Sequence, residues 1–209
     1  YIAVTTVLAV CVLPLQARSP RGLNPATMKN WDIVLGKNAS PSETYAAEEF
    51  QQFFDEASGI KLPIVTAVDR SDRHVFIGAS QAMRSSDVGF STNDFGDEDL
   101  RIIIRENHIA IAGGQPRGTL YGVYTFLEDY LGVRFLTHDH THVPPIGNTQ
   151  VIEPVDRFYH PPIEYRQANY GENVAYPKQA ARLRNNAVVK DPKFGGSAPF
   201  TNINHSWYQ

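Results

Sequence analysis

Three histidines at a spacing of two are the first residues whose types and positions suggest chemistry. His138, His140 and His142 lie in one short segment, so an extended backbone would place their imidazoles on one face. Imidazole is a common zinc ligand, and Asp139 could complete such a site. However, His-x-His pairs also occur on solvated edges, and no second ligand cluster lies elsewhere in the sequence. We therefore predict a solvated edge with no metal, and we predict no cofactor.

Acidic residues are the second group to consider, because acid-base sites often use paired carboxylates. Glu48, Glu49, Asp55 and Glu56 fall on the polar face of a predicted helix, where carboxylates are solvated and their pKa values are not pushed apart. Glu164 and Glu172 follow much later. We predict no catalytic residue among them.

A glycine pair and an arginine stand at the start of another predicted helix. Gly113 and Gly114 could form a phosphate cradle, but the lysine of a P-loop and the third glycine of a dinucleotide fingerprint are missing. A plain strand-to-helix turn is the favoured interpretation. Arg117 is unfavourably placed for the helix dipole, so it either contacts a carboxylate, for example across a domain interface, or is solvated.

The elements that would position these residues are organised around residues 101–135. This stretch predicts a strand (101–105), a turn at Glu106-Asn107, a strand (108–112), a helix (116–131) and a returning strand (133–136). The helix carries one apolar stripe, which a sheet must cover. Gly118 and Gly122 indicate close approach of its backbone to that sheet.

Upstream residues add the rest of an α/β layer. A strand is predicted at 31–36, and a helix at about 41–58 with Ser40 and Glu43 forming a capping box and Gly59 ending it. Short strands follow at 62–66 and 74–77, the second of them apolar and therefore central, and residues 84–98 form a loop. The predicted fold class is α/β (α+β): a mixed sheet with two main helices packed on it.

Composition and the first residues limit the cellular setting. The chain has 209 residues, 42% of them hydrophobic, and a net charge of −3, which offers no basic field for nucleic acid or an anionic membrane. Residues 1–17 are mostly apolar and resemble part of a signal peptide, which predicts a secreted or periplasmic protein with no membrane segment after cleavage. Cys11 lies in that segment; a lipid anchor there would want a smaller residue than Val10 before it.

The remaining boundaries follow from proline content and periodicity. Residues 18–30 are predicted as a linker, 31–142 as the α/β domain, and 143–162 as a second, proline-rich linker. A strand at 163–167 and a helix at 177–186, with Ala181 and Leu183 inward, predict the start of a β/α barrel over 163–209. Because so little of a barrel is present, we expect residues 163–209 to be mobile.

Several sequence runs resemble one kind of domain. The run RGTLYGVYTFLEDYLGVRF (117–135) after IAIAGG (109–114) is similar to the end of the small α/β domain that precedes the barrel in bacterial α-glucuronidases. It is more loosely similar to the same domain in bacterial β-N-acetylhexosaminidases, and most similar to a group of uncharacterised bacterial proteins of this architecture. The runs at 45–59, 62–65 and 75–80 match that domain in the same order.

The resemblance implies a function and two site residues. It implies a non-catalytic N-terminal domain of an exported glycoside hydrolase acting on a polysaccharide or oligosaccharide, with the catalytic carboxylates beyond Gln209. Arg166, at the end of the first barrel strand, and His205 are the candidate sugar ligands, each weighed against a structural role. The alternative is a structural or carbohydrate-binding module without hydrolase activity, which would need exposed aromatic residues, whereas Phe50, Phe53 and Phe54 fall on predicted core faces.

Overall fold

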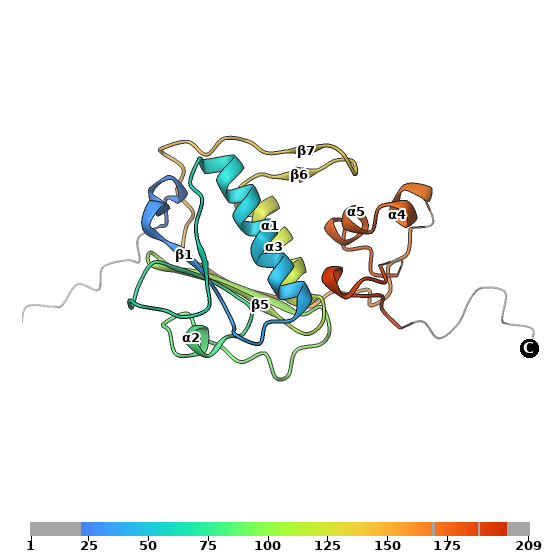
Figure 1. Cartoon of the computed structure of the whole chain (residues 1–209), viewed down its shortest axis with the longest axis horizontal. Coiled ribbons are helices and arrows are strands. Elements are labelled where there is room, and N and C mark those ends of the chain that lie inside the picture. The colour runs from blue at the N-terminus through green and yellow to red at the C-terminus, as the bar shows by residue number, and fades with distance from the viewer. Residues whose placement is uncertain (1–21, 169, 188, 200–209) are drawn as a thin grey trace, which may run out of the picture.

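A six-stranded mixed sheet carries the fold, with two long helices on one of its faces (Figure 1). The computed structural model describes residues 22–199 except 169 and 188. The elements in chain order are η1 (Pro25–Asn30), β1 (Asp32–Leu35), α1 (Pro41–Ser58), β2 (Ile64–Val65), β3 (His74–Ile77), α2 (Gln81–Arg84), β4 (Leu100–Ile104), β5 (His108–Gly113), α3 (Gly118–Tyr130), β6 (Arg134–Phe135), β7 (Thr141–His142), β8 (Val155–Tyr159), α4 (Gly171–Ala175), α5 (Pro177–Arg182) and η2 (Pro192–Phe194).

The sheet has the strand order β2-β1-β3-β5-β4-β8. The strands β2, β1, β3 and β5 run parallel, whereas β4 is antiparallel to both β5 and β8. The predicted hairpin of residues 101–112 is therefore the β4–β5 pair, and β3 is central as expected. The α/β prediction with a mixed sheet and two main helices is confirmed.

Local signals explain where α1 begins and ends. The Ser40 hydroxyl accepts a hydrogen bond from the Glu43 N–H (3.2 Å), and the Glu43 carboxylate accepts one from the Ser40 N–H (2.8 Å). At the other end Gly59 has φ +70°, a conformation in which glycine carries no steric penalty. The capping box and the glycine stop fix the predicted bounds of this helix.

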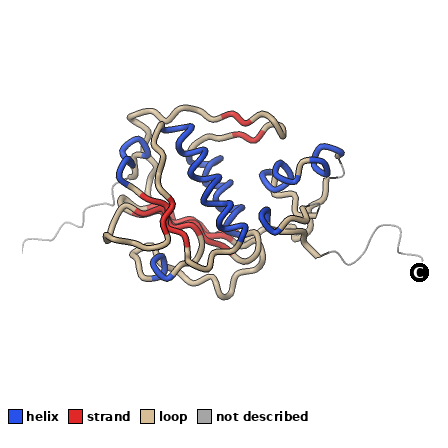
Figure 2. The backbone as a smooth tube through the Cα atoms, viewed as in Figure 1, coloured by secondary structure: helices blue, strands red, loops and turns tan. Residues whose placement is uncertain are grey.

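The main core lies between the sheet and the pair α1 and α3. Figure 2 shows the two helices as one layer above the red strands. Phe50 of α1 packs on Phe126 of α3 with ring centroids 5.3 Å apart, and Leu127 is fully buried. A Cβ on Gly118 would lie 2.3 Å from the Asp99 carbonyl oxygen, and one on Gly122 would lie 2.8 Å from Ile111. The predicted close approach of α3 to the sheet is confirmed.

The segment 143–162, predicted as a linker, contributes to the domain instead. Ile152 and Leu23 exchange two backbone hydrogen bonds of 2.8 Å, and β8 forms the edge of the sheet beside β4. Prolines flank β8 without entering it, which an edge strand tolerates. Residues 25–30, also predicted as linker, form η1, in which Met28 is fully buried.

The returning strand and the barrel start also differ from expectation. β6 pairs with β7 in a separate two-stranded ribbon rather than with the main sheet. Residues 163–168 form no strand, because no described segment offers them a neighbouring strand to pair with. The helix predicted at 177–186 ends at Arg182, and Leu183, predicted inward, is 48% exposed.

Candidate functional site

The candidate site is the junction between the α/β layer and residues 161–199, which form a compact unit at one end of the molecule (Figure 1). This unit contains α4, α5 and η2. Ala180, Ala181 and Val189 are buried in the same apolar cluster as α1 and α3. The described part of the segment, residues 163–199 without 169 and 188, is therefore docked on the α/β layer, which contradicts the prediction of a mobile tail there.

Glu98 is the centre of the first buried polar cluster at this junction. Its side chain is 5% exposed and receives Arg117 Nε (2.8 Å) and Asn186 Nδ2 (2.5 Å) on one carboxylate oxygen. Arg166 Nη2 donates to the other oxygen. Arg117 also donates to Asp97 (3.1 Å) and to the Gly195 carbonyl oxygen (3.2 Å). One carboxylate of the α/β layer thus organises three side chains, two of them from the docked segment.

This cluster settles the two interpretations of Arg117. The guanidinium is buried and contacts two carboxylates of its own domain, so the carboxylate interpretation is confirmed and the solvated one is wrong. The Gly195 contact reaches across to the docked segment. A buried arginine needs such partners for its charge. The two carboxylates therefore explain why Arg117 is tolerated at the start of a helix, where the helix dipole disfavours a cation.

Glu49 is the centre of the second cluster. It lies on α1 and is 2% exposed, contrary to the prediction that it is a solvated acid. Arg182 of α5 binds it in a bidentate pair (2.9 and 3.1 Å), and the Tyr45 hydroxyl donates to it at 2.8 Å. The charges of this helix follow a helical period that indicates a solvated face, and no local signal shows that a later arginine covers Glu49. Arg182 also stacks over the rings of Phe53 and Phe135, each at 5.0 Å.

Burial changes the ionisation of the tyrosines beside these clusters. Desolvation and then the Glu49 carboxylate raise the pKa of Tyr45, which keeps its hydroxyl a hydrogen-bond donor. Desolvation and then Glu98 raise the pKa of Tyr121 in the same way. Both buried carboxylates are engaged by arginines, an arrangement that holds two segments together rather than one that transfers protons.

Two clefts adjoin the docked segment. One, of about 400 Å³, is lined by Tyr121, Tyr159, Arg166 and Arg184 among others. The other, of about 480 Å³, is lined by Asp97, Asp99, His160 and Glu164 among others. Arg166 is thus close to an open space of the size of small-ligand pockets.

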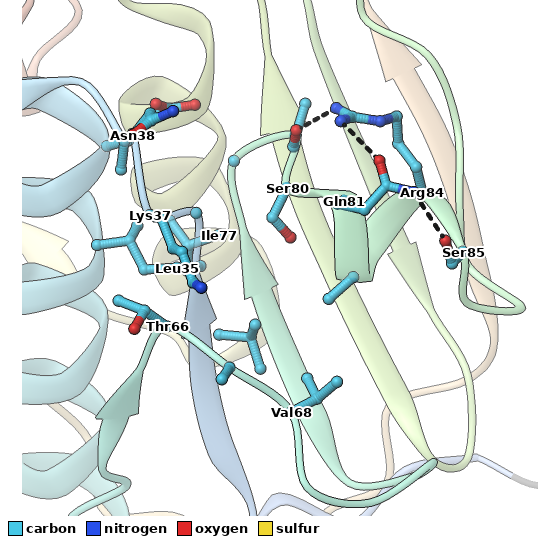
Figure 3. A pocket seen from close by; sticks show the side chains of 18 residues that line it. Leu35, Lys37, Asn38, Thr66, Val68, Ile77, Ser80, Gln81, Arg84 and Ser85 are labelled. Atoms are coloured by element: carbon cyan, nitrogen blue, oxygen red, sulfur yellow. Dashed lines mark hydrogen bonds between the residues drawn. The ribbon is translucent and has the colours of Figure 1, made fainter.

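A further cleft lies at the carboxyl ends of β1 and β3 and is shown in Figure 3. It has a volume of about 660 Å³ and is lined by the loops that follow these two strands; its polar lining residues include Lys37, Ser80 and Arg84. The chain leaves β1 towards α1 and leaves β3 towards α2, on opposite faces of the sheet. Ligands of open α/β sheets gather at such positions.

The predicted sugar ligands have different outcomes. Arg166 is mostly covered: its Nε donates to the Arg184 carbonyl oxygen (2.8 Å), and its two terminal nitrogens donate to the Ile163 carbonyl oxygen and to Glu98. These contacts describe an interface side chain, and its role in sugar binding stays a prediction. His205 lies outside the described residues, as do Cys11 and the predicted signal peptide.

The three histidines do not lie on one extended strand. Residues 137–140 form the turn between β6 and β7, because the Leu136 and Thr137 N–H groups both donate to the His140 carbonyl oxygen (3.1 and 3.0 Å). His138 stacks on Tyr176 with centroids 3.6 Å apart and contacts Glu172 at 3.0 Å. Within residues 22–199, the described side chains form no group of three or more possible metal ligands.

The glycine pair has a packing role. The Gly113 N–H donates to the Thr119 hydroxyl (3.0 Å) and the Gly114 N–H donates to the Asp99 carbonyl oxygen (2.8 Å). A Cβ on Gly114 would lie 1.8 Å from the Gly96 carbonyl oxygen. With both N–H groups engaged inside the protein, the strand-to-helix turn is the interpretation that fits.

Comparisons with known proteins place the fold. A scan against protein-family models and a search of curated proteins both found no match. Among solved structures, the chain is similar to a family GH115 4-O-methyl-α-glucuronidase with specificity for decorated arabinogalactans (13% identity, TM-score 0.57, 76% of this chain, 25% of that one). It is also similar to the GH20 β-N-acetylhexosaminidase of Streptomyces coelicolor A3(2) (13% identity, TM-score 0.54, 81% and 31%) and to a Streptomyces plicatus β-hexosaminidase (14%, 0.50, 81% and 30%).

These likenesses establish a glycoside-hydrolase-like α/β fold and no specific family. The chain spans between a quarter and a third of the length of the enzymes it resembles. None of the helices in the described part of the chain is long and apolar enough to cross a membrane.

Proposed function

We propose that this chain is the non-catalytic N-terminal part of an exported carbohydrate-active protein, a glycoside hydrolase of α-glucuronidase-like or hexosaminidase-like architecture. The α/β domain acts as a rigid support that holds the next segment in a fixed orientation. Export to the periplasm or the medium rests on the apolar residues 1–17. Hydrolysis itself is assigned to residues beyond Gln209.

The observation that carries this proposal is the polar docking of residues 161–199. Two nearly fully buried carboxylates, Glu49 and Glu98, each bind an arginine of that segment. Buried ion pairs contribute little net stability but fix geometry, since any other arrangement leaves a charge without a partner. A domain that must present the start of a following unit in one orientation needs this kind of junction.

A second function, an independent carbohydrate-binding module, has weaker support. The partly exposed rings Phe90, Phe95 and Phe158 gather on the sheet face opposite α1 and α3. However, Phe95 and Phe158 meet at an interplanar angle of 69°, so they do not form the flat surface on which a sugar ring stacks. The support role therefore remains the main proposal.

The test compares two lengths of the same gene product. The 209-residue chain should release no aryl leaving group from aryl glucuronides or aryl N-acetylhexosaminides, whereas the polypeptide extended through the downstream sequence should do so. A pull-down with insoluble polysaccharides separates the module alternative. Activity in the 209-residue chain, or retention on polysaccharide without activity in the longer chain, would reject the support role.

A further inference from the structure

The described sheet has two edges, the two-residue strand β2 and the five-residue strand β8, and β8 is the longer of them. The strand order ends at β8 beside β4, and within the described ranges no strand pairs with its outer side. Phe158 is 53% exposed and Tyr159 is 41% exposed. An exposed edge with apolar side chains is a template for pairing with another strand.

The direction of the backbone groups follows from the neighbouring pair β4–β5. The Arg105 N–H donates to the His108 carbonyl oxygen, and the Gly114 N–H donates to the Asp99 carbonyl oxygen, each at 2.8 Å. The odd-numbered residues of β4 therefore point their backbone groups towards β5. Since these groups alternate along a strand, the even-numbered residues of β4 point theirs towards β8.

The register between β4 and β8 then determines which backbone groups of β8 face β4. Leu100 lies opposite Tyr159 and Ile102 lies opposite Arg157, so these β8 residues are bonded to β4. The backbone N–H and C=O groups of Asp156 and Phe158 consequently lie in the plane of the sheet and point away from β4, at its outer edge. In the part of the chain that the structure describes, no hydrogen bond reaches them. His160 continues the register, because its side chain contacts Asp99 (2.6 Å), its neighbour on the extended β4 line.

We propose that two copies of this chain pair antiparallel through β8, about a two-fold axis at Phe158, and so join their sheets into one. This arrangement places Phe158 against the partner copy's Phe158. It places Arg157, which binds Asp129 in its own copy, against Tyr159 of the other copy. It places Asp156, which binds Arg101, against His160, which contacts Asp99, so that acid and imidazole extend pairs already present in each sheet. Neighbours of these kinds, aromatic with aromatic, cation with aromatic and acid with imidazole, are favourable across strands.

Two prolines support this particular register. Pro154 and Pro162 lie equally far from Phe158, four residues to either side, at positions that would otherwise point their N–H groups outward. In the paired arrangement, Pro154 of one copy lies opposite Pro162 of the other. The ladder of hydrogen bonds between the two copies ends at these positions, where no N–H donor is needed. The residues between them are the ones with complementary partners.

Other registers and partners fit less well. A two-fold axis at Asp156 would set two aspartates against each other and would place Pro154 opposite Phe158, which removes a backbone donor. The sequence of residues 154–162 is complementary to itself about Phe158. Pairing with a strand of an unrelated protein would not require this property, whereas pairing with a second copy would. The second copy is therefore the partner that this edge fits.

A cysteine substitution tests the geometry directly. Directly opposed, hydrogen-bonded residues of antiparallel strands have Cα atoms about 5.5 Å apart, within the range that a disulfide spans. Phe158→Cys in the 209-residue chain should therefore oxidise to a covalent dimer. Glu153→Cys, exposed but outside the ladder, is the matched control and should form dimer much more slowly. Equal rates for the two variants would overturn the proposed register.

Light scattering and sedimentation measure the association itself. The unaltered chain should dimerise reversibly, and Phe158→Lys should raise the dissociation constant about tenfold or more, since lysines on edges oppose pairing. Glu153→Lys should leave it unchanged, and circular dichroism checks that both variants fold. A chain that stays monomeric at high concentration, or a dimer indifferent to Phe158→Lys, would reject the proposal, including the case in which another segment covers this edge.

Discussion

The α/β layer and the docked segment of residues 161–199 are held by different forces. The layer is built on an apolar core in which Phe50, Tyr124 and Leu127 are fully buried. The docked segment contributes few large apolar side chains to that core and is fastened by Glu49 and Glu98 to its arginines. Apolar burial drives folding whatever the exact partner, whereas buried charges demand particular partners. The hydrophobic pattern of the sequence therefore determines the structure of the α/β layer, whereas specific ion pairs determine the position of the docked segment.

The largest test of this contrast is Glu98→Ala. The change leaves the buried guanidinium of Arg117 and the largely covered one of Arg166 without their shared acceptor, which should cost about 3–5 kcal/mol at the junction. Limited proteolysis should then cut residues 161–199 while the α/β layer stays resistant. Asp97→Ala is the control, because its exposed carboxylate also touches Arg117 but should matter little. Equal protease resistance in both variants would show that the segment is held by apolar contacts after all.

The second test addresses the apolar core. Leu127→Ala should lower the free energy of unfolding by about 2–5 kcal/mol, because the side chain of Leu127 on α3 is fully buried. Leu183→Ala, in the docked segment, should change it little, since nearly half of that side chain is exposed. Chemical denaturation measures both, and a larger effect at Leu183 would contradict the division between the two regions.

A third, smaller effect is expected where α3 meets the sheet. Gly122→Ala places a methyl group 2.8 Å from Ile111 Cγ2, so the helix must shift and the unfolding free energy should fall by about 1–3 kcal/mol. The same glycine substitution should cost less in an Ile111→Ala background, because alanine lacks the Cγ2 methyl group that valine would keep. An equal cost in both backgrounds would mean that the close approach is not the cause.

The smallest expected effect lies at an exposed tie between the regions. Hydrogen bonds from His138 lower the pKa of Glu172, so His138→Ala should return that pKa towards its ordinary value in an NMR titration. A depressed folded pKa contributes stability above the unfolded pKa, and this contribution is lost as the pH falls through the folded pKa. The tie should therefore weaken only in acid. An unchanged Glu172 titration in His138→Ala would remove this contact from the junction.

The same contrast explains what the sequence could predict. Period, capping residues and glycine stops identified α1, α3 and the β4–β5 hairpin, because these signals are local. Glu49 was misplaced, since a carboxylate on a polar helix face looks solvated until Arg182, more than a hundred residues later, covers it. β8 was missed because flanking prolines suggest a linker, and only the neighbouring strand shows that the run between them is paired.

The pairing of the chain's distant parts has a consequence for how the protein is made. β8 completes the sheet beside β4, whose Arg101 binds Asp156 55 residues later. Leu23 exchanges two backbone hydrogen bonds with Ile152. During synthesis this edge of the sheet therefore cannot be completed until the ribosome has passed residue 159. Contacts between such distant positions slow folding, so the pairing of β8 with β4 should be among the last steps of folding.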